Sequence, residues 1–331
     1  MKRITIEDVA ELAGVSRQTV SRAINDKGEI SQQTKERVMM AVEQLGYRPN
    51  RLAQGMVTQR TYTIGLIISN ITNPFFPEVT RGVQDAAQAK GYNVFLCNTD
   101  DTADIEIQEL HSLAAQGVDG IILFSHQASD ADLTAFADNY HPIVVINRLF
   151  QHPNASVMMV NNYRGARLAA DYFIDQGHTH LGMLTNNSSS YSQARRVRGF
   201  QERIQERGLL LPDDCIATAP ATLEGGRQAA HQLLDGHPQI TAVFTYNDLM
   251  SLGAIRACRE RGLHIPHEVA IIGFDDISFA AMATPSLTTI HVDKYAMGKQ
   301  AVDRLIAMIE APGTPLPVVE IEVELMFRES A

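Results

Sequence analysis

From residue 63 onward the chain repeats one pattern: a short apolar run, a polar turn, a stretch of helical periodicity, and a glycine before the next run. The apolar runs span residues 64–69, 94–97, 120–124, 143–146, 181–184, 242–245 and 269–274. Strands this continuously apolar are covered on both faces, which is typical of parallel sheets flanked by helices. Gly91, Gly117, Gly177, Gly208 and Gly262 each follow Lys, Gln or Arg, as expected where a helix ends. The pattern therefore predicts an α/β fold.

Polar residues gather where these predicted strands end, and ligands of parallel sheets bind beyond the carboxyl ends of the strands. The clusters are Asn70, Asn73, Phe75 and Phe76, then Asn147 and Arg148, then Ser188–Ser192 with Arg196, then Asn247 with Asp248, and Asp275 with Asp276. Amide, guanidinium and carboxylate groups beside two phenylalanines suit a sugar, because they hydrogen-bond hydroxyls and offer an apolar face. The alternative is that these residues only cap helices and close turns.

The first 49 residues have a different, all-helical pattern. Thr5 can cap a first helix with Asp8 completing a capping box, and Gly14 suits a left-handed turn after it. Ser16 can cap a second helix from residue 17 to about residue 24, and a third helix is expected between Ser31 and Gly46. The outward residues of the second helix are Arg17, Gln18, Ser21 and Arg22, which are types that read base edges in the major groove. A helical cap with merely solvated charges is the alternative.

Charge is divided unevenly along the chain. Residues 1–60 hold ten Lys and Arg against seven Asp and Glu, a net charge of +3. The remaining residues have a net charge of −13, which brings the overall charge to −10. A basic head on an acidic body concentrates affinity for DNA at one end. With 45% hydrophobic residues in 331, the chain can bury more than one core. No apolar run reaches membrane-spanning length and no signal-peptide core follows Met1, so we expect a cytoplasmic protein.

Sequence signatures of catalysis are missing from the body. It contains neither G-x-S-x-G nor G-x-x-x-x-G-K, and His178 and His180 fit a solvated or packed role better than a metal site. Cys97, Cys215 and Cys258 are scattered and odd in number, which predicts passive thiols rather than a disulfide or metal site. We therefore expect no enzyme activity, no cofactor and no metal.

Several phrases resemble the LacI/GalR family of bacterial repressors across essentially the whole chain. They are the head itself, YRPNRLAQGM, NPFF, DGIIL, INR, NDLMSLGA, IIGFDD and PSLTTI, and they occur in order. The resemblance implies an N-terminal all-α helix-turn-helix head (residues 1–49), a hinge helix or linker (50–60) and an α/β two-lobed core (61–331) resembling type I periplasmic binding proteins. The first lobe would hold about 61–161 and 292–318, and the second about 162–291 and 319–328, with a final strand near residues 319–327.

The resemblance also implies how the head binds DNA. Base edges in the major groove would be read by Arg17, Gln18 and Arg22. Phosphate contacts, which set position without reading sequence, would come from Thr5, Ser16, Thr19, Ser21 and Asn25. The hinge segment would enter the minor groove through Asn50, Ala53 and Met56, with the Met56 thioether as the apolar wedge. An ordinary linker is the alternative for this segment, and Gly55 weakens it as a helix.

A small-molecule effector would bind between the lobes. The positions matching the family pocket are Asn73, Phe75, Phe76, Asn147, Arg148, Ser190, Ser192, Arg196, Asn247 and Asp275. Of these, Arg196, Asn247 and Asp275 resemble the trio that grips ring hydroxyls in sugar-responsive members. Arg148 and Arg196 together suit a phosphate or carboxylate, so a charged effector is an open alternative.

The expected function is a sequence-specific transcriptional regulator, a repressor of carbohydrate-use genes whose affinity for a palindromic operator is set by a sugar or sugar phosphate. A homodimer is expected, since operator half-sites mirror a two-fold axis. Other effectors, such as a nucleobase or a phosphorylated or carboxylated metabolite, are alternatives. A sugar-binding carrier or an enzyme is a weaker one, since neither would use the head.

Overall fold

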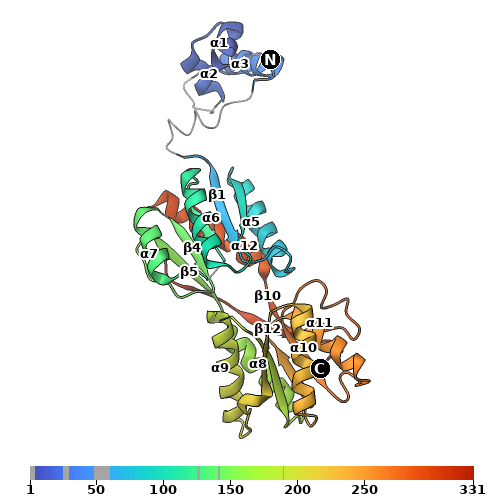
Figure 1. The fold of residues 1–331 in the computed structure, drawn as a ribbon. Helices are drawn as coiled ribbons and strands as arrows, with labels where there is room; N and C mark the ends of the chain where they lie inside the picture. Colours follow the sequence, from blue (N-terminus) through green and yellow to red (C-terminus); the bar gives the residue numbers. More distant parts are fainter. Residues whose placement is uncertain (1–3, 25–29, 48–59, 125–126, 141, 189) are drawn as a thin grey trace. The chain divides into compact units, whose positions relative to one another are not determined.

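The computed structural model describes residues 4–24, 30–47, 60–124, 127–140, 142–188 and 190–331. It divides into two compact units, residues 1–61 and 62–331, each with its own hydrophobic core (Figure 1). Among the described residues, no helix is long and apolar enough to cross a bilayer. Asn25, Asn50, Ala53 and Met56 lie outside the described residues, as does most of the predicted hinge segment.

The first unit is a bundle of three helices, α1 (Ile6–Ala13), α2 (Arg17–Ile24) and α3 (Gln32–Leu45). Thr5 and Asp8 form the predicted capping box, and Gly14 ends α1 with φ of 64°. The Ser16 hydroxyl accepts a hydrogen bond from the Thr19 amide at the start of α2, and Ser31 and Gly46 bound α3. Val9, Val20 and Val38 are fully buried where the three helices meet. The predicted helix boundaries of the head are confirmed.

The second unit contains two six-stranded sheets, each flanked by helices (Figure 1). The first sheet has the order β11-β5-β4-β3-β1-β2 and all its pairs are parallel. Helices α6 and α7 cover one face and α5 and α12 the other. Its strands are β1 (Thr63–Ile68), β2 (Asn93–Asn98), β3 (Ile121–Leu123), β4 (Ile143–Ile146), β5 (Ala155–Val160) and β11 (Val319–Ile321). Its helices are α5 (Phe75–Ala89), α6 (Ala103–Ala115), α7 (Asp130–Asn139) and α12 (Lys294–Glu310).

The second sheet has the order β12-β10-β9-β8-β6-β7, and only the β10–β12 pair is antiparallel. Helices α8 and α9 cover one face and α10 and α11 the other. Its strands are β6 (Leu181–Asn186), β7 (Ile216–Ala219), β8 (Ala242–Thr245), β9 (Ala270–Asp275), β10 (Thr288–Val292) and β12 (Val323–Met326). Its helices are α8 (Asn162–Asp175), α9 (Tyr191–Glu206), the short 3-10 helix η1 (Asp213–Cys215), α10 (Leu223–Gly236) and α11 (Asp248–Glu260).

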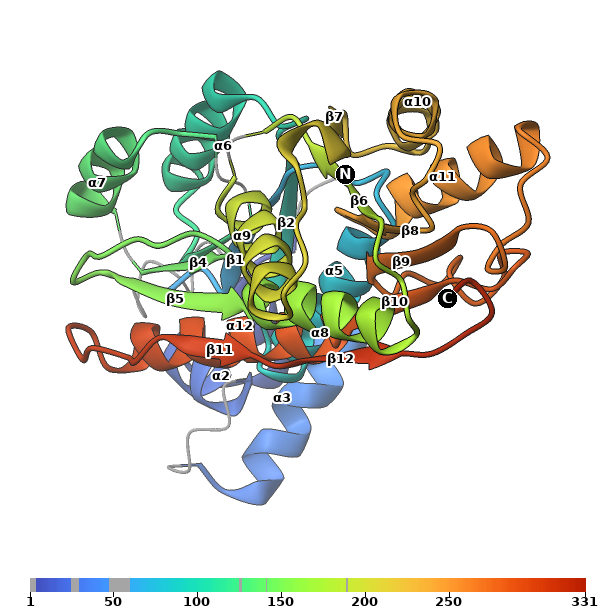
Figure 2. The same cartoon turned by 90° about the horizontal axis from the view of Figure 1, so that it is seen from below.

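Each sheet is the centre of one lobe, and the chain passes between the lobes three times: after β5, after β10, and between β11 and β12 (Figure 2). The expected final strand near residues 319–327 is wrong in one respect. Its first part, β11, pairs with β5 in the first sheet, and only β12 joins the second, so the chain crosses at Glu322. Apolar and polar residues alternate around Glu322 as in a single strand. No turn residue marks the position where the chain passes from one sheet to the other, so the sequence pattern does not reveal the division.

All seven apolar runs form strands, and the two sheets are predominantly parallel, which confirms the predicted α/β class. Gly91, Gly117, Gly177, Gly208 and Gly262 have positive φ at helix ends, as expected. The sequence pattern missed β5, β7 and β10. Strand β7 (IATA) contains a single large apolar residue. Strand β10 (TTIHV) is mostly polar in composition, although four of its five residues are buried.

Candidate functional site

A cavity of about 300 Å³ lies between the lobes, at the carboxyl ends of the parallel strands of both sheets. The first lobe contributes the segment between β1 and α5, the end of β3, the residue after β4 and Asp101 after β2. The second lobe contributes the segments after β6, β7, β8 and β9 together with the first turns of α9. This volume is at the small end of ligand pockets, so the cavity suits a small metabolite.

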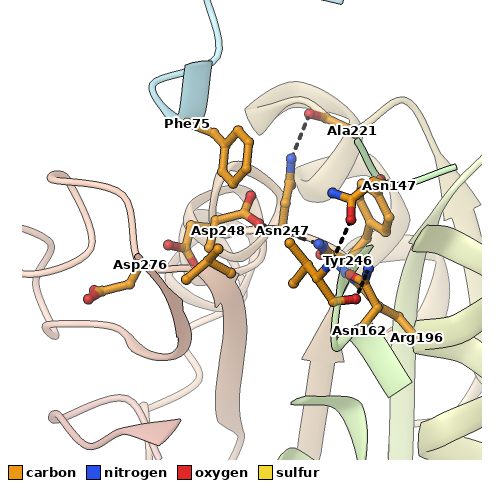
Figure 3. A network of polar contacts seen from close by, with 12 residues as sticks. Phe75, Asn147, Asn162, Arg196, Ala221, Tyr246, Asn247, Asp248 and Asp276 are labelled. Atoms are coloured by element: carbon orange, nitrogen blue, oxygen red, sulfur yellow. Dashed lines mark hydrogen bonds and ion pairs between the residues drawn. The ribbon is translucent and has the colours of Figure 1, made fainter. Parts of the chain in front are cut away.

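Eight of the ten predicted effector residues line this cavity: Asn73, Phe75, Phe76, Asn147, Ser192, Arg196, Asn247 and Asp275. They come from both lobes and are separated by up to 202 positions in sequence, so only the fold brings them together. Figure 3 shows Phe75, Asn147, Arg196 and Asn247 in this region.

Two predicted residues do not line the cavity. The Arg148 guanidinium turns to the carboxylate of Asp130 at the start of α7, with Nη2 2.5 Å from Oδ1. The Ser190 hydroxyl caps α9 by accepting the Gln193 amide at 3.2 Å. Arg148 therefore does not stand beside Arg196 in the cavity wall, which weakens the alternative that the two arginines together bind a phosphate or carboxylate.

Arg196 organises the second-lobe wall and is 5% exposed. Its Nε donates to Asn162 Oδ1 at 2.8 Å, Nη1 donates to the carbonyl oxygen of Tyr246, and Nη2 lies 3.5 Å from Asp275 Oδ1 (Figure 3). The guanidinium also stacks on the Phe274 ring at 3.5 Å from its centroid. A guanidinium has five N–H groups. Three are used by the described residues, which leaves two for a ligand, while Asp275 compensates the charge.

Asp275 is the buried carboxylate of the cavity. Burial raises its pKa from 3.8 to about 6, although the positive charges of Arg196 and Lys294 act in the opposite direction. Its backbone has φ of 114°, a value that residues other than glycine rarely adopt. Asn147 and Asp101 also line the cavity and have φ of 59° and 55°. Backbone strain of this kind gathers at ligand sites, where the surroundings must hold it in place.

The amide groups of the cavity are fixed in orientation by the backbone. Asn147 Oδ1 accepts the Val160 amide at 2.8 Å, and Asn73 Oδ1 accepts the Phe75 amide at 3.1 Å. Asn247 caps α11 through the Met250 amide at 2.9 Å and donates to the Ala221 carbonyl at 3.3 Å. With the oxygens of Asn73 and Asn147 engaged, their NH₂ groups are the ends left to donate to a ligand.

Several cavity residues were not predicted from the sequence. Tyr246 and Phe124 add aromatic walls, and Asp101 adds a second carboxylate. Asp101 lies in the turn between β2 and α6, which begins at Ala103. Its place directly after β2 was the available signal. The segment 220–222 was missed because β7, which it follows, was not recognised as a strand.

The remaining buried polar residues support the wall. Asp248 is fully buried, accepts the Ile277 amide at 2.8 Å and the Thr289 hydroxyl at 2.5 Å, and its pKa is raised well above the ordinary value by burial. Burial also raises the pKa of the Tyr246 hydroxyl. Burial therefore disfavours the charged form of both groups.

One group elsewhere has the donor types of a metal site. Atoms of Asp214, Cys215 and His237 lie within 4.8 Å of one another near η1, and His237 Nε2 is 3.7 Å from Asp214 Oδ2. Burial and the nearby Asp214 raise the pKa of the Cys215 thiol, which opposes the thiolate that a metal requires. None of the three residues lines the cavity.

The predicted DNA-reading face lies on α2. Arg17, Gln18 and Arg22 are exposed, and Ser21 and Thr19 are half-buried. Arg17 Nη1 forms an ion pair with Glu7 on α1 at 3.0 Å. Thr5 and Ser16 are engaged as helix caps through their hydroxyls. A short helix whose exposed face carries two arginines and a glutamine has the geometry of a recognition helix.

Comparison with known families accounts for both units. Residues 5–50 match the family described as bacterial regulatory proteins, lacI family, and residues 61–329 match the periplasmic binding proteins and sugar binding domain of LacI family. The chain therefore belongs to the LacI family of DNA-binding transcriptional repressors with an effector-binding domain like that of type I periplasmic binding proteins. This is a family of regulators and not of enzymes.

Individual relatives match over the full length. The ribose operon repressor of Escherichia coli (strain K12) is 34% identical, with 99% of each chain covered. The HTH-type transcriptional repressor PurR of Histophilus somni (strain 129Pt) is 32% identical, with 98% of each covered. The crystal structure of the Lac repressor dimer bound to operator and the anti-inducer ONPF superposes with a TM-score of 0.89 at 28% identity, covering 99% of each chain.

Proposed function

We propose that this repressor responds to a small neutral sugar bound in the cavity between its lobes, and that it controls genes for carbohydrate use. The observation that supports a neutral ligand is the distribution of charge in the cavity wall. Among the described residues, Arg196 is the one basic side chain of the wall, and Asp275 already compensates it. Asp101 adds a further carboxylate. A phosphate or carboxylate would therefore meet no uncompensated cation, whereas neutral hydroxyls meet both donors and acceptors.

The shape of the wall supports the same ligand class. Phe75 and Phe76 pack edge to face, with ring centroids 5.3 Å apart, and Phe76 packs in the same way on Phe124. These rings form an apolar part of the first-lobe wall, and the second lobe supplies the polar side chains of Arg196, Asn247 and Asp275. A sugar ring has one apolar face and a rim of hydroxyls, so it matches this division. The relative named ribose operon repressor is consistent with a sugar-responsive regulator.

A nucleobase is the second candidate. Tyr246 and Phe124 add aromatic surface beyond that of Phe75 and Phe76, and a planar heterocycle would stack on such rings. Asp275, when protonated, and the Asn147 amide would supply both donors and acceptors to its edge. The two candidates differ in whether hydroxyls or ring nitrogens meet Asp275.

A thermal-shift screen of the full chain separates these possibilities. The panel holds neutral pentoses and hexoses, their phosphates, and free nucleobases. A ligand that binds only the native state raises the melting temperature. We expect a neutral sugar to raise it and its phosphate to raise it less or not at all. A shift only with phosphorylated compounds would overturn the charge argument, and a shift only with nucleobases would favour the second candidate.

For DNA binding, we propose that α2 reads operator half-sites in the major groove through Arg17, Gln18 and Arg22, with Thr5, Ser16, Thr19 and Ser21 near the phosphates. The basic head supports this, since most of the affinity for DNA is electrostatic. We also propose a homodimer acting in the cytoplasm. Its support is the likeness to the Lac repressor dimer and the exposed hydrophobic residues Phe95 and Leu96 on the edge strand β2.

A further inference from the structure

Lys294 is a fully buried lysine at the junction of the two lobes. It is the first residue of α12, where the chain returns from the second lobe to the first, and it is 1% exposed. Its ammonium donates to the carbonyl oxygens of Asp275 and Asp276 at 2.8 Å each, and to that of Val292 at 3.1 Å. The carbonyls of Asp275 and Val292 end β9 and β10 of the second lobe, and that of Asp276 directly follows β9. One side chain therefore fastens a first-lobe helix to second-lobe strands.

On the first-lobe side, the ammonium also lies 3.5 Å from the carboxylate of Glu78. Glu78 is in the first turn of α5, three residues after Phe75 of the cavity. Helices α5 and α12 touch through their backbones: a Cβ at Gly82 would collide with the Tyr295 carbonyl, and one at Gly298 with the Val79 carbonyl. Backbones in direct contact leave no room for sliding. Lys294 is therefore anchored in a closely packed pair of first-lobe helices.

On the second-lobe side, the lysine holds a strained turn. Asp275 and Asp276 have φ of 114° and 54°, and their carbonyls converge on the same ammonium. The Asp275 side chain faces Arg196 in the cavity, whereas the Asp276 carboxylate accepts Arg328 at 2.7 Å and His291 at 2.8 Å. Charge-assisted hydrogen bonds of this kind are the strong ones in proteins. A ligand that displaces the backbone of Asp275 would therefore shift the carbonyls that Lys294 holds.

We propose that Lys294 is a positioning residue that carries effector occupancy from Asp275 to α5 and α12 of the first lobe. It does not line the cavity, so it acts through the backbone of Asp275 and not by touching the effector. This inference deepens the proposed function and rests on its effector pocket. It predicts that removing the ammonium separates two properties that are coupled in the native protein: binding of the effector and its effect on operator affinity.

Three variants of the full chain test the proposal. Lys294→Met keeps the apolar stem and removes the three donors, and Glu78→Gln removes only the first-lobe partner, at a side chain that is 44% exposed and tolerant of change. The matched control is Lys90→Met. Lys90 also joins α5 to α12, through an ion pair of 3.2 Å with Asp303, and both partners of that ion pair belong to the first lobe. If Lys294→Met fails to fold, Glu78→Gln carries the same test with a smaller expected effect.

The first measurement needs no ligand. Hydrogen exchange of the amides in residues 275–278 and in the first turns of α5 and α12 is compared among the variants. We expect Lys294→Met to exchange faster by about tenfold or more in both lobes, because local opening is no longer held from either side. Lys90→Met should leave residues 275–278 unchanged. Faster exchange confined to one lobe in Lys294→Met would overturn the proposal.

The second measurement compares operator affinity with and without D-ribose as the probe, alongside calorimetric binding of D-ribose. The native protein should change its operator affinity by about 5- to 150-fold on binding an effector. Lys294→Met should bind the probe within about threefold of the native protein but lose most of that change, whereas Lys90→Met should retain it. A full response in Lys294→Met would refute the role. If the native protein does not bind D-ribose, that sugar is excluded as the effector, and the exchange pattern alone decides the role of Lys294.

Discussion

Asp275 makes a specific contribution to how stability depends on pH. In the unfolded chain its carboxyl loses a proton near pH 3.8, and in the folded protein near pH 6, because burial opposes the charge. Between these values the folded protein holds more protons than the unfolded chain, so this contribution to stability falls as pH rises through the window. Asp275→Asn should remove this pH-dependent loss of stability. The difference in unfolding free energy between the variant and the wild type should therefore change by about 1–3 kcal/mol between pH 4 and pH 7. Urea unfolding at several pH values measures it, and parallel pH profiles for both proteins would contradict the burial argument.

Arg22 is the second residue whose role is open to direct test. Arg22→Ala should weaken binding to the specific operator by about 1–3 kcal/mol and relax its sequence preference. The control is Arg37→Ala, an exposed arginine of α3 outside the proposed reading face, which should lower affinity for all DNA sequences alike. Gel shifts with specific and scrambled duplexes compare the two. Equal losses on both duplexes for Arg22→Ala would assign it to phosphate and not to base contacts.

At the same scale, the sequence located most of the cavity but not its electrostatics. Asn73, Phe75, Arg196, Asn247 and Asp275 follow strands, so their common edge was predictable. The partner of Arg148 was not, because Asp130 comes close to it only once α7 packs beside β4. The compensation of Arg196 depends on a contact across 79 positions, which no local pattern encodes.

Among the secondary-structure elements, helix pairs pack so closely that glycine is required at the contact. Gly82→Ala on α5 would place a methyl group against the Tyr295 carbonyl of α12. We expect it to lower the free energy of unfolding by about 1–3 kcal/mol. Gly236→Ala on α10 is the control, since nothing lies within 4 Å of the added carbon. Alanine is the better helix former by about 1 kcal/mol, so that variant should be unchanged or more stable. Equal unfolding midpoints for Gly82→Ala and Gly236→Ala would contradict the packing argument.

The elements themselves were predictable to different degrees. Short helices with strong caps, such as α1 after Thr5 and α3 between Ser31 and Gly46, were found to the residue, because capping is a local interaction. Strands β7 and β10 were not found, since their buried threonines and alanines are apolar only in their tertiary surroundings. The division at Glu322 depends on which sheet each half joins, and pairing partners are not written in the strand itself.

On the scale of the whole molecule, the edge strand β2 offers a test of assembly. Leu96 is 43% exposed on a strand that ends its sheet, and such edges are normally covered. Leu96→Glu should weaken self-association by about 1–3 kcal/mol, because it places a charge in the proposed contact. Leu210→Glu is the control, at a leucine that is 79% exposed on the connection between α9 and η1. Sedimentation over a dilution series compares them, and an unchanged dimer in Leu96→Glu would exclude β2 from the interface.

The central claim joins the two units: a sugar in the cavity of the core sets the affinity of the head for its operator. The most direct measurement is the affinity of the full chain for a palindromic operator from its own genomic neighbourhood, with and without a saturating neutral sugar identified by the thermal-shift screen. The account predicts a change of about 5- to 150-fold, absent when the phosphate ester of the same sugar is used. An operator affinity that is identical with and without every sugar that binds the core would contradict it.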